Sequence, residues 1–182
     1  FAVSAISDTD AAANSVAEGA AVGTVVGVTV SSSDVNGGAL TYSLTADSSG
    51  GGFTINATTG VITVANSAKI DYETAAGHAY TVTAQASDGT LTSSQSFSIG
   101  VTDVAPSTPV DSNGATNTVV EGAAASTAVG ITASSSDVNG PGVTWSLTGD
   151  TSGGGLTTGT SGIGGTGGTT GGGRGSMGGS GL

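Results

Sequence analysis

The sequence predicts an all-β fold, made of tandem antiparallel β-sandwiches of which the second is incomplete. Two observations support this prediction. The chain contains a long internal repeat, and its apolar residues alternate with polar ones as they do in half-buried strands. The chain has 182 residues, of which 34 are glycine and none is cysteine. That length suits one full domain and part of another.

The internal repeat relates residues 16–52 to residues 119–155. The two segments align without a gap, and 25 of their 37 positions are identical. Asp34 aligns with Asp137, which gives a period of 103 residues (137 − 34). A period of this size is that of a domain rather than of a solenoid repeat, so the sequence predicts a tandem array of domains.

Strand signals fill the first repeat. In "YTVTAQAS" (80–87) and "SFSIGVT" (96–102) apolar and polar residues alternate with period two. Shorter runs rich in Thr and Val follow the same rule and are separated by Gly, Asn and Asp; they are residues 24–30, 40–44, 53–55 and 61–64. No segment carries an apolar stripe of helical spacing longer than one turn. Short strands with a turn about every ten residues are typical of a β-sandwich.

The repeat divides the chain into segments. We expect a first repeat over residues 9–105, a linker over 106–118 and the start of a second repeat over 119–155. Residues 156–182 contain 13 glycines in 27 positions, and glycine loses the most backbone entropy on ordering, so a flexible low-complexity tail is expected there. The chain starts with Phe1 rather than Met, which predicts a processed product or a window of a longer protein.

The charge balance excludes several functions. With 13 acidic residues and two basic ones, Lys69 and Arg174, the formal net charge is −11. A nucleic-acid surface needs clustered Lys and Arg, so none is expected, and an anionic membrane surface is disfavoured for the same reason. No apolar run is long enough to span a membrane. The partners that remain are hard metal ions, because the available ligands are oxygens.

The acidic residues of the first repeat lie at strand ends and in turns. Glu18 stands at the start of a strand, Asp71 and Glu73 lie in "IDYE", and Asp103 ends the last strand. In a sandwich, turn residues collect at the two ends of the domain. Clustered carboxylates repel each other unless a cation binds among them or water screens them.

These motifs resemble those of the cadherin repeat, in the divergent form of bacterial surface proteins. The resemblance rests on "AEG" (17–19), "SDVN" (33–36), "FTINATTGVITV" (53–64), "IDYE" (70–73), "TAQASDG" (83–89) and "VTD" (101–103). It covers one full repeat and the opening of another, and residues 1–8 resemble the closing strand of a preceding repeat or a donor strand. It implies tandem Greek-key, immunoglobulin-like or cadherin-like β-sandwiches with Ca²⁺ bound between successive repeats.

The resemblance also implies the calcium ligands. The junction between the two repeats takes Glu18, Asp71, Glu73, Asp103, Asp137 and Asn139. The junction at the amino-terminal end takes Asp8, Asp34, Asn36 and Asp88. The usual Asn-Asp-Asn linker after "VTD" is replaced by "VAPSTPVDSNGATNTV" (104–119), so we expect one or two ions at a junction rather than three.

The expected function is that of a structural and adhesive extracellular protein, in which Ca²⁺ stiffens a rod or filament at the cell surface. Its partners are then neighbouring repeats or identical subunits, and a cell-surface receptor. Head-to-tail assembly is a narrower hypothesis, in which residues 1–7 of one subunit complete the unfinished sandwich of the next. The alternative is a carbohydrate-binding or ice-binding module of a bacterial surface adhesin. No enzyme is expected, since the single histidine, His78, has no neighbouring candidate nucleophile.

Overall fold

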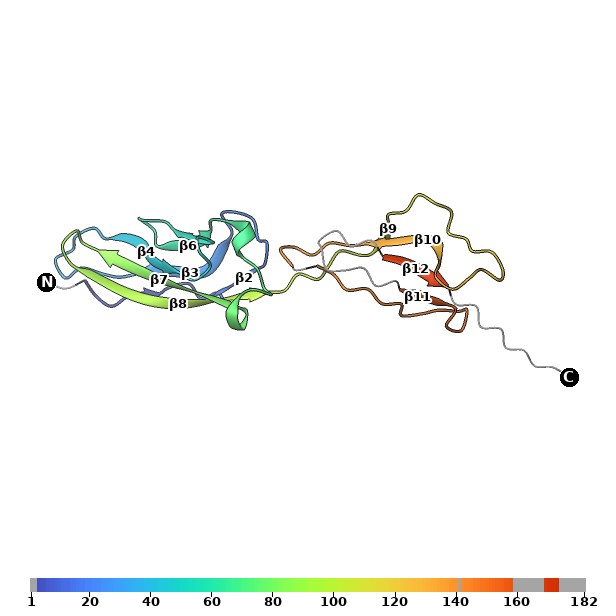
Figure 1. Ribbon diagram of the computed structural model, residues 1–182. Coiled ribbons are helices and arrows are strands. Elements are labelled where there is room, and N and C mark those ends of the chain that lie inside the picture. Colours follow the sequence, from blue (N-terminus) through green and yellow to red (C-terminus); the bar gives the residue numbers. More distant parts are fainter. Residues whose placement is uncertain (1–2, 141, 159–168, 174–182) are drawn as a thin grey trace. The chain divides into compact units, whose positions relative to one another are not determined.

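The computed structural model describes residues 3–140, 142–158 and 169–173. The chain divides into two compact units: Phe1–Val104 with Val138–Gly140, and Ala105–Asp137 with Pro141–Leu182. Nearly all regular structure is β (Figure 1). The predicted all-β fold class is therefore confirmed.

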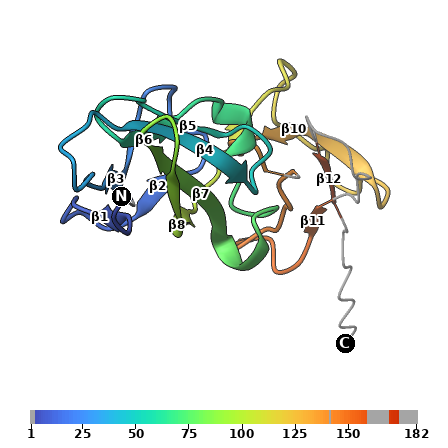
Figure 2. The same cartoon turned by 90° about the vertical axis from the view of Figure 1, so that its left-hand side faces the viewer.

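The first unit consists of two four-stranded sheets. One sheet has the strand order β1-β3-β6-β5 and the other the order β2-β8-β7-β4. Figure 2 shows β7 and β8 side by side, as their continuous antiparallel register requires. The strands are β1 (Ser7–Asp8), β2 (Ser15–Ala17), β3 (Val25–Ser31), β4 (Thr41–Asp47), β5 (Phe53–Ile55), β6 (Val61–Val64), β7 (Ala79–Ser87) and β8 (Thr92–Thr102).

The core forms because the strands alternate as predicted. In β7, Tyr80, Val82, Ala84 and Ala86 are buried and their neighbours are not. The inward side chains of both sheets meet in one cluster, which is built mainly from Val, Ile and Ala. One-sided burial fixes strand register, because a slip of one residue turns every apolar side chain to solvent.

The amino-terminal segment belongs to this same core, which corrects its assignment to a preceding repeat. β1 pairs antiparallel with β3, and Val3 forms a bridge to Asp34. The side chains of Val3 and Ile6 are buried in the cluster. Residues 3–8 are thus the leading strand of their own sandwich. Residues 1–8 contain too few apolar residues for the sequence to reveal which sandwich they complete.

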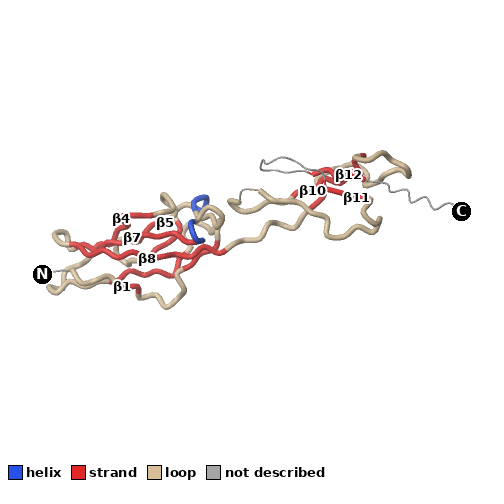
Figure 3. The backbone as a smooth tube through the Cα atoms, turned by 60° about the horizontal axis from the view of Figure 1, so that its bottom comes forward, coloured by secondary structure: helices blue, strands red, loops and turns tan. Residues whose placement is uncertain are grey.

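Two short 3₁₀ turns, η1 (Ser67–Lys69) and η2 (Ala76–His78), connect β6 to β7 (Figure 3). The Asn66 side chain caps η1 by accepting a hydrogen bond from the Ala68 N–H. Gly77 and His78 have positive φ, 65° and 56°. The tight backbone leaves residues 71–78 as an ordered loop at one end of the unit.

The second unit repeats local features of the first. Its strands are β9 (Val110–Asp111), β10 (Thr127–Ser134), β11 (Leu156–Thr158) and β12 (Thr169–Gly173), in the order β11-β12-β10-β9. The Asp111 carboxylate accepts the Thr132 N–H at 2.9 Å, as the Asp8 carboxylate accepts the Thr29 N–H at 3.0 Å. The repeat therefore begins before residue 119, and β9 lies within the predicted linker. β11 and β12 lie within the predicted glycine-rich tail, of which residues 159–168 and 174–182 lie outside the described residues.

Candidate metal centre

Two strand ends meet at the carboxyl end of β8. β2 pairs with β8 in parallel, with Ala17 opposite Thr102. Glu18 and Asp103 are the next residue on each strand, so the register places them beside each other. Gly19 follows with a φ of 61°, a conformation that favours glycine. Its N–H donates to the Ile70 carbonyl at 2.9 Å, which ties this end of β2 to the loop that carries Glu73.

A third carboxylate comes from that loop. Ligand oxygens of Glu18, Glu73 and Asp103 all lie within 4.8 Å of one another. Within the described part of the chain they form the one group of three His, Cys, Asp or Glu side chains that meets this limit. Glu73 and Asp103 are exposed, whereas Glu18 is only 2% exposed. We call Glu18, Glu73 and Asp103 the carboxylate cluster.

Glu18 is held by the backbone. Its Oε1 accepts the N–H of Val104 at 2.7 Å, and its Oε2 accepts the N–H of Tyr72 at 3.4 Å. A buried carboxylate is stable only with hydrogen bonds and a compensating charge. Glu18 has the hydrogen bonds, and carboxylate oxygens of Glu73 and Asp103 lie within 4.8 Å of its own. The arrangement is suited to a bound cation.

The loop around Glu73 has its own fixed points. The Tyr72 ring stacks on the His78 ring with centroids 3.9 Å apart and an interplanar angle of 10°. His78 Nδ1 lies 3.0 Å from the Tyr72 carbonyl oxygen. The Tyr80 hydroxyl donates to the Asp71 carbonyl oxygen at 3.1 Å. These contacts position the backbone on both sides of Tyr72, and Glu73 follows directly.

Asp71 lies outside the cluster. Its Oδ1 accepts the Thr74 N–H at 3.0 Å, so the carboxylate closes the loop instead of joining Glu73. The spacing of two residues in "IDYE" does not show whether Asp71 closes the loop or binds an ion with Glu73, because both carboxylates lie in one loop in either case. Asp71 remains a proposed ligand.

The other two residues predicted for this junction fall in different units. Asn139 belongs to the first unit, where its Nδ2 donates to the carbonyl oxygens of Ser67 and Ile70, both at 3.0 Å. Asp137 belongs to the second unit. Its Oδ1 is buried and has no hydrogen-bond partner among the described residues.

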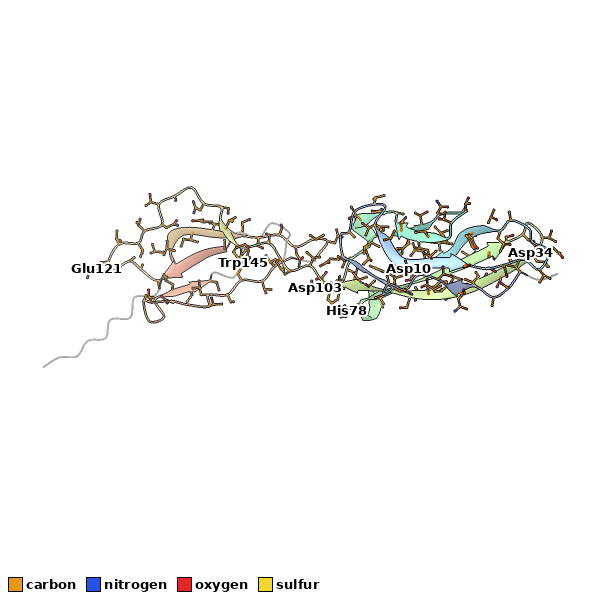
Figure 4. All side chains as sticks on the ribbon, turned by 180° about the vertical axis from the view of Figure 1, so that it is seen from behind. Asp10, Asp34, His78, Asp103, Glu121 and Trp145 are labelled. Carbon is orange, nitrogen blue, oxygen red and sulfur yellow. The ribbon has the colours of Figure 1, made fainter. Side chains whose placement is uncertain are left out.

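Two members of the set predicted for the amino-terminal end, Asp8 and Asp34, lie apart from each other. Asp8 lies opposite Val30 on β3, whereas Asp34 lies opposite Val3. Five positions of strand separate them, about 17 Å. Asp34 and Asp103 lie at opposite ends of the first unit, with His78 near Asp103 (Figure 4).

Each of these carboxylates organises its own turn. Asp8 Oδ1 accepts the Asp10 N–H, and Asp34 Oδ1 accepts the Asn36 N–H. Asp88 Oδ1 accepts the N–H groups of Leu91 and Thr90, at 2.6 and 2.7 Å. The Leu91 and Thr90 hydrogen bonds lower the pKa of Asp88 below its usual value. These hydrogen bonds give each carboxylate a local role, and a cation bound at this end of the unit remains a prediction.

Comparisons with known proteins identify the family of one part of the chain. The sequence profile of the cadherin domain matches residues 13–102, which run from just before β2 to the end of β8. These residues form a cadherin domain. No curated protein matches the chain.

Solved structures of cadherins are similar to this chain. Drosophila N-cadherin EC1-4 is 22% identical with a TM-score of 0.50, and the match covers 74% of this chain and 34% of that one. Human protocadherin-24 EC1-2 is 24% identical with a TM-score of 0.47, over 74% of this chain and 61% of that one. Mouse cadherin-23 EC22-24 is 20% identical with a TM-score of 0.47, over 90% and 51%. The chain spans less than two thirds of each of these structures. The match to N-cadherin supports the cadherin-like sandwich.

None of the described residues belongs to a helix with the length and apolar character that membrane crossing requires.

Proposed function

We propose that this chain is an extracellular structural and adhesive repeat protein whose cadherin domain binds Ca²⁺ at the carboxylate cluster. The convergence of Glu18, Glu73 and Asp103 within 4.8 Å is the observation that carries the proposal. The cadherin family supports an adhesive, extracellular role.

The cluster fits the ion chemically. Ca²⁺ binds oxygens at 2.3–2.6 Å, so two oxygens on one ion can be up to about 5 Å apart. The spacing within the cluster satisfies this limit. All three ligands are carboxylates, the hard anionic donors that Ca²⁺ prefers. Ca²⁺ takes six to eight oxygens, whereas the cluster brings together one ligand oxygen from each of three side chains, so there is room for further ligands. We propose Asp71, Asp137 and Asn139 for this role on the sequence pattern.

Bound Ca²⁺ would neutralise carboxylates that otherwise repel each other and would join the ends of β2 and β8 to the loop of residues 71–78. A ligand that binds only the folded state stabilises it by mass action, about 2.7 kcal/mol at a hundredfold excess over the dissociation constant. Because the proposed ligands come from both repeats, the ion would also stiffen the chain between them and favour an extended rod.

Calcium titration of the full chain tests the proposal. We expect the melting temperature to rise in millimolar CaCl₂ and to fall in excess chelator. Glu73→Gln should remove most of this difference. The matched control is Asp10→Asn, since Asp10 is exposed and its Oδ1 accepts the Ala12 N–H in a local turn. A melting temperature that is the same in calcium and in chelator would overturn the calcium site.

Head-to-tail assembly by strand addition remains a proposal of lower rank. The leading strand now pairs with β3, and Val3 and Ile6 lie in the core of their own unit. Addition to another subunit therefore requires these side chains to leave that core. If the chain without residues 1–7 still forms the same polymers, assembly by strand addition is excluded.

Ligand binding is the second candidate function. An open hollow of about 450 Å³ is lined by nine residues, among them Asp34, Tyr42 and Thr58. Hydroxyl and carboxylate groups beside an aromatic ring suit a sugar. Binding on a glycan array that Tyr42→Ala abolishes would favour this function.

A further inference from the structure

β8 has an open edge. It is the longest strand of the first unit, 11 residues, and runs almost the whole length of that unit (Figure 1). On one side it pairs with β7 over residues 92–100. On the other side it pairs with β2 only over Gly100–Thr102. Within the described chain, no strand pairs with this second side over residues 92–99.

The pairing with β2 shows which groups face outward. The N–H of Gly100 donates to the Asn14 carbonyl, and the carbonyl of Thr102 accepts from the Glu18 N–H. In an antiparallel ladder, the N–H and C=O groups of alternate residues point to the same side. The even-numbered residues Thr92, Ser94, Ser96 and Ser98 therefore direct their backbone groups away from β7. All four are exposed.

The other sheet edges of this unit are closed or short. β1 has two residues and β5 has three. β4 is long enough, but the Tyr42 N–H donates to the Ala57 carbonyl at 2.9 Å, and its register shifts between Leu44 and Ala46. A bulge and a covered edge both hinder strand addition. The β8 edge has no register shift, and no other strand of the described chain covers it over residues 92–98. The Ser96 carbonyl accepts a hydrogen bond of 3.3 Å from the Gln95 side chain, which strand pairing would replace.

The composition of the β8 edge favours a second copy of the same chain. Charged residues and proline are the usual protections of an edge strand. Residues 89–102, "GTLTSSQSFSIGVT", contain neither. Elsewhere the formal net charge of −11 makes two copies repel each other. Over residues 92–98 two copies can approach without opposing carboxylates. The outward groups are also self-complementary, because the four residues lie symmetrically about Gln95.

We propose that residues 92–98 of β8 form a self-association edge that pairs antiparallel with the same residues of a second copy about a two-fold axis. Gln95 then faces Gln95 of the other copy, Ser94 faces Ser96, and Thr92 faces Ser98. The Gln95 pair is not hydrogen-bonded. The even-numbered residues form four pairs across the two copies, and each pair exchanges two hydrogen bonds, about eight in all. The two β2-β8-β7-β4 sheets become one continuous sheet. The pairing is isologous and closes as a dimer.

A cysteine cross-link tests the register. The chain has no cysteine, so Gln95→Cys introduces one thiol at the two-fold axis. Non-hydrogen-bonded partners across an antiparallel pair have Cα atoms about 4.5 Å apart, within the range of a disulfide. We expect mild oxidation of the full-length variant to give a covalent dimer. The control is Thr81→Cys, an exposed residue of β7 that lies inside the same sheet. Equal cross-linking of the two variants would overturn the proposal.

Sedimentation of the cysteine-free chain provides the second test. All samples contain excess chelator, so calcium-dependent association does not contribute and the result does not depend on the proposed metal site. We expect a monomer–dimer equilibrium, with a dissociation constant at least tenfold higher in Ser94→Asp/Ser96→Asp, because that register sets Asp against Asp. Thr81→Asp should leave the constant unchanged. A chain that remains monomeric at millimolar concentration would also overturn the proposal.

Discussion

Glu18 and Asp103 lie side by side because Ala17 and Thr102, the residues before them, are paired in a parallel register. The pairing joins residues from opposite ends of the domain sequence. Glu18 is buried whereas Asp103 is exposed, because the Glu18 carboxylate turns inward and accepts the N–H groups of Val104 and Tyr72. Glu18 therefore has a structural role as the acceptor of these two N–H groups, in addition to its proposed role as a calcium ligand.

The first prediction separates these roles. Glu18→Ala leaves the N–H groups of Val104 and Tyr72 without their acceptor, and an unsatisfied buried donor costs about 1–3 kcal/mol. We expect the free energy of unfolding to fall by about that amount in urea denaturation with excess chelator. Glu73→Gln, at an exposed site, should change it by less than about 0.5 kcal/mol in chelator and should reduce only the stabilisation by calcium. Equal losses for both variants in chelator would contradict the distinction.

Part of this cluster could be predicted from the sequence. The period-two pattern predicted β7 and β8. The sequence places Glu18, Glu73 and Asp103 at strand ends and in a turn, and the resemblance to the cadherin repeat implied that they share an ion. The parallel pairing of β2 with β8 could not be read from the sequence, because three residues carry no signal of their partner. Local hydrogen bonds explain the remainder: the carboxylates of Asp71 and Asp8 accept backbone N–H groups nearby, a choice that composition and spacing do not reveal.

The second prediction concerns Gly27 in β3. Its φ is 77°, and an added Cβ would overlap the Ala13 carbonyl oxygen. The register between β3 and β6 shifts around this position. Gly27→Ala should therefore combine left-handed strain of about 1–2 kcal/mol with a backbone clash, and we expect a loss of more than about 2 kcal/mol in unfolding free energy.

Gly37 offers the matched control for Gly27. Its φ is 75°, but nothing lies within 4 Å of an added Cβ. Gly37→Ala should cost only the strain, about 1–2 kcal/mol. If the two alanine variants unfold at the same urea concentration, the close approach of Ala13 to β3 is not energetically important.

The third prediction is a pH dependence in the second unit. Asp150 accepts hydrogen bonds from Ser152, Gly154 and Leu156. The hydrogen bond from the Ser152 side chain, followed by the backbone bonds, lowers the pKa of Asp150 from 3.8 to about 2. Because the folded pKa is lower than the unfolded one, the loop is stabilised above pH 4, and this stabilisation is lost as the pH falls through about 2.

Nuclear magnetic resonance of the Asp150 carboxyl carbon measures this directly. We expect its titration midpoint near pH 2. In Asp150→Asn the amide protons of Ser152 and Gly154 should exchange faster at neutral pH, because the neutral amide is a weaker acceptor. A midpoint near 3.8 would show that these hydrogen bonds do not hold the charged form.

The fourth prediction concerns the loop that presents Glu73. The His78 ring stacks on Tyr72, and its Nδ1 lies 3.0 Å from the Tyr72 carbonyl oxygen. His78→Ala removes both contacts, and the alanine must adopt the same φ of 56° without the contacts that stabilise this conformation in His78. We expect calcium affinity to fall severalfold, because Glu73 follows Tyr72 directly and loses its fixed position. The unfolding free energy in chelator should change by no more than about 1 kcal/mol, since His78 is exposed.

His78→Asn separates stacking from backbone strain. Asparagine tolerates positive φ and can hydrogen-bond the Tyr72 carbonyl, but it cannot stack. If the ring contact positions Glu73, the asparagine variant should bind calcium as weakly as the alanine variant in isothermal titration calorimetry while unfolding like the parent chain in chelator. If the asparagine variant instead binds calcium as tightly as the parent chain, the backbone geometry at Gly77 and position 78 positions the loop. The aromatic stack then has no role in the site.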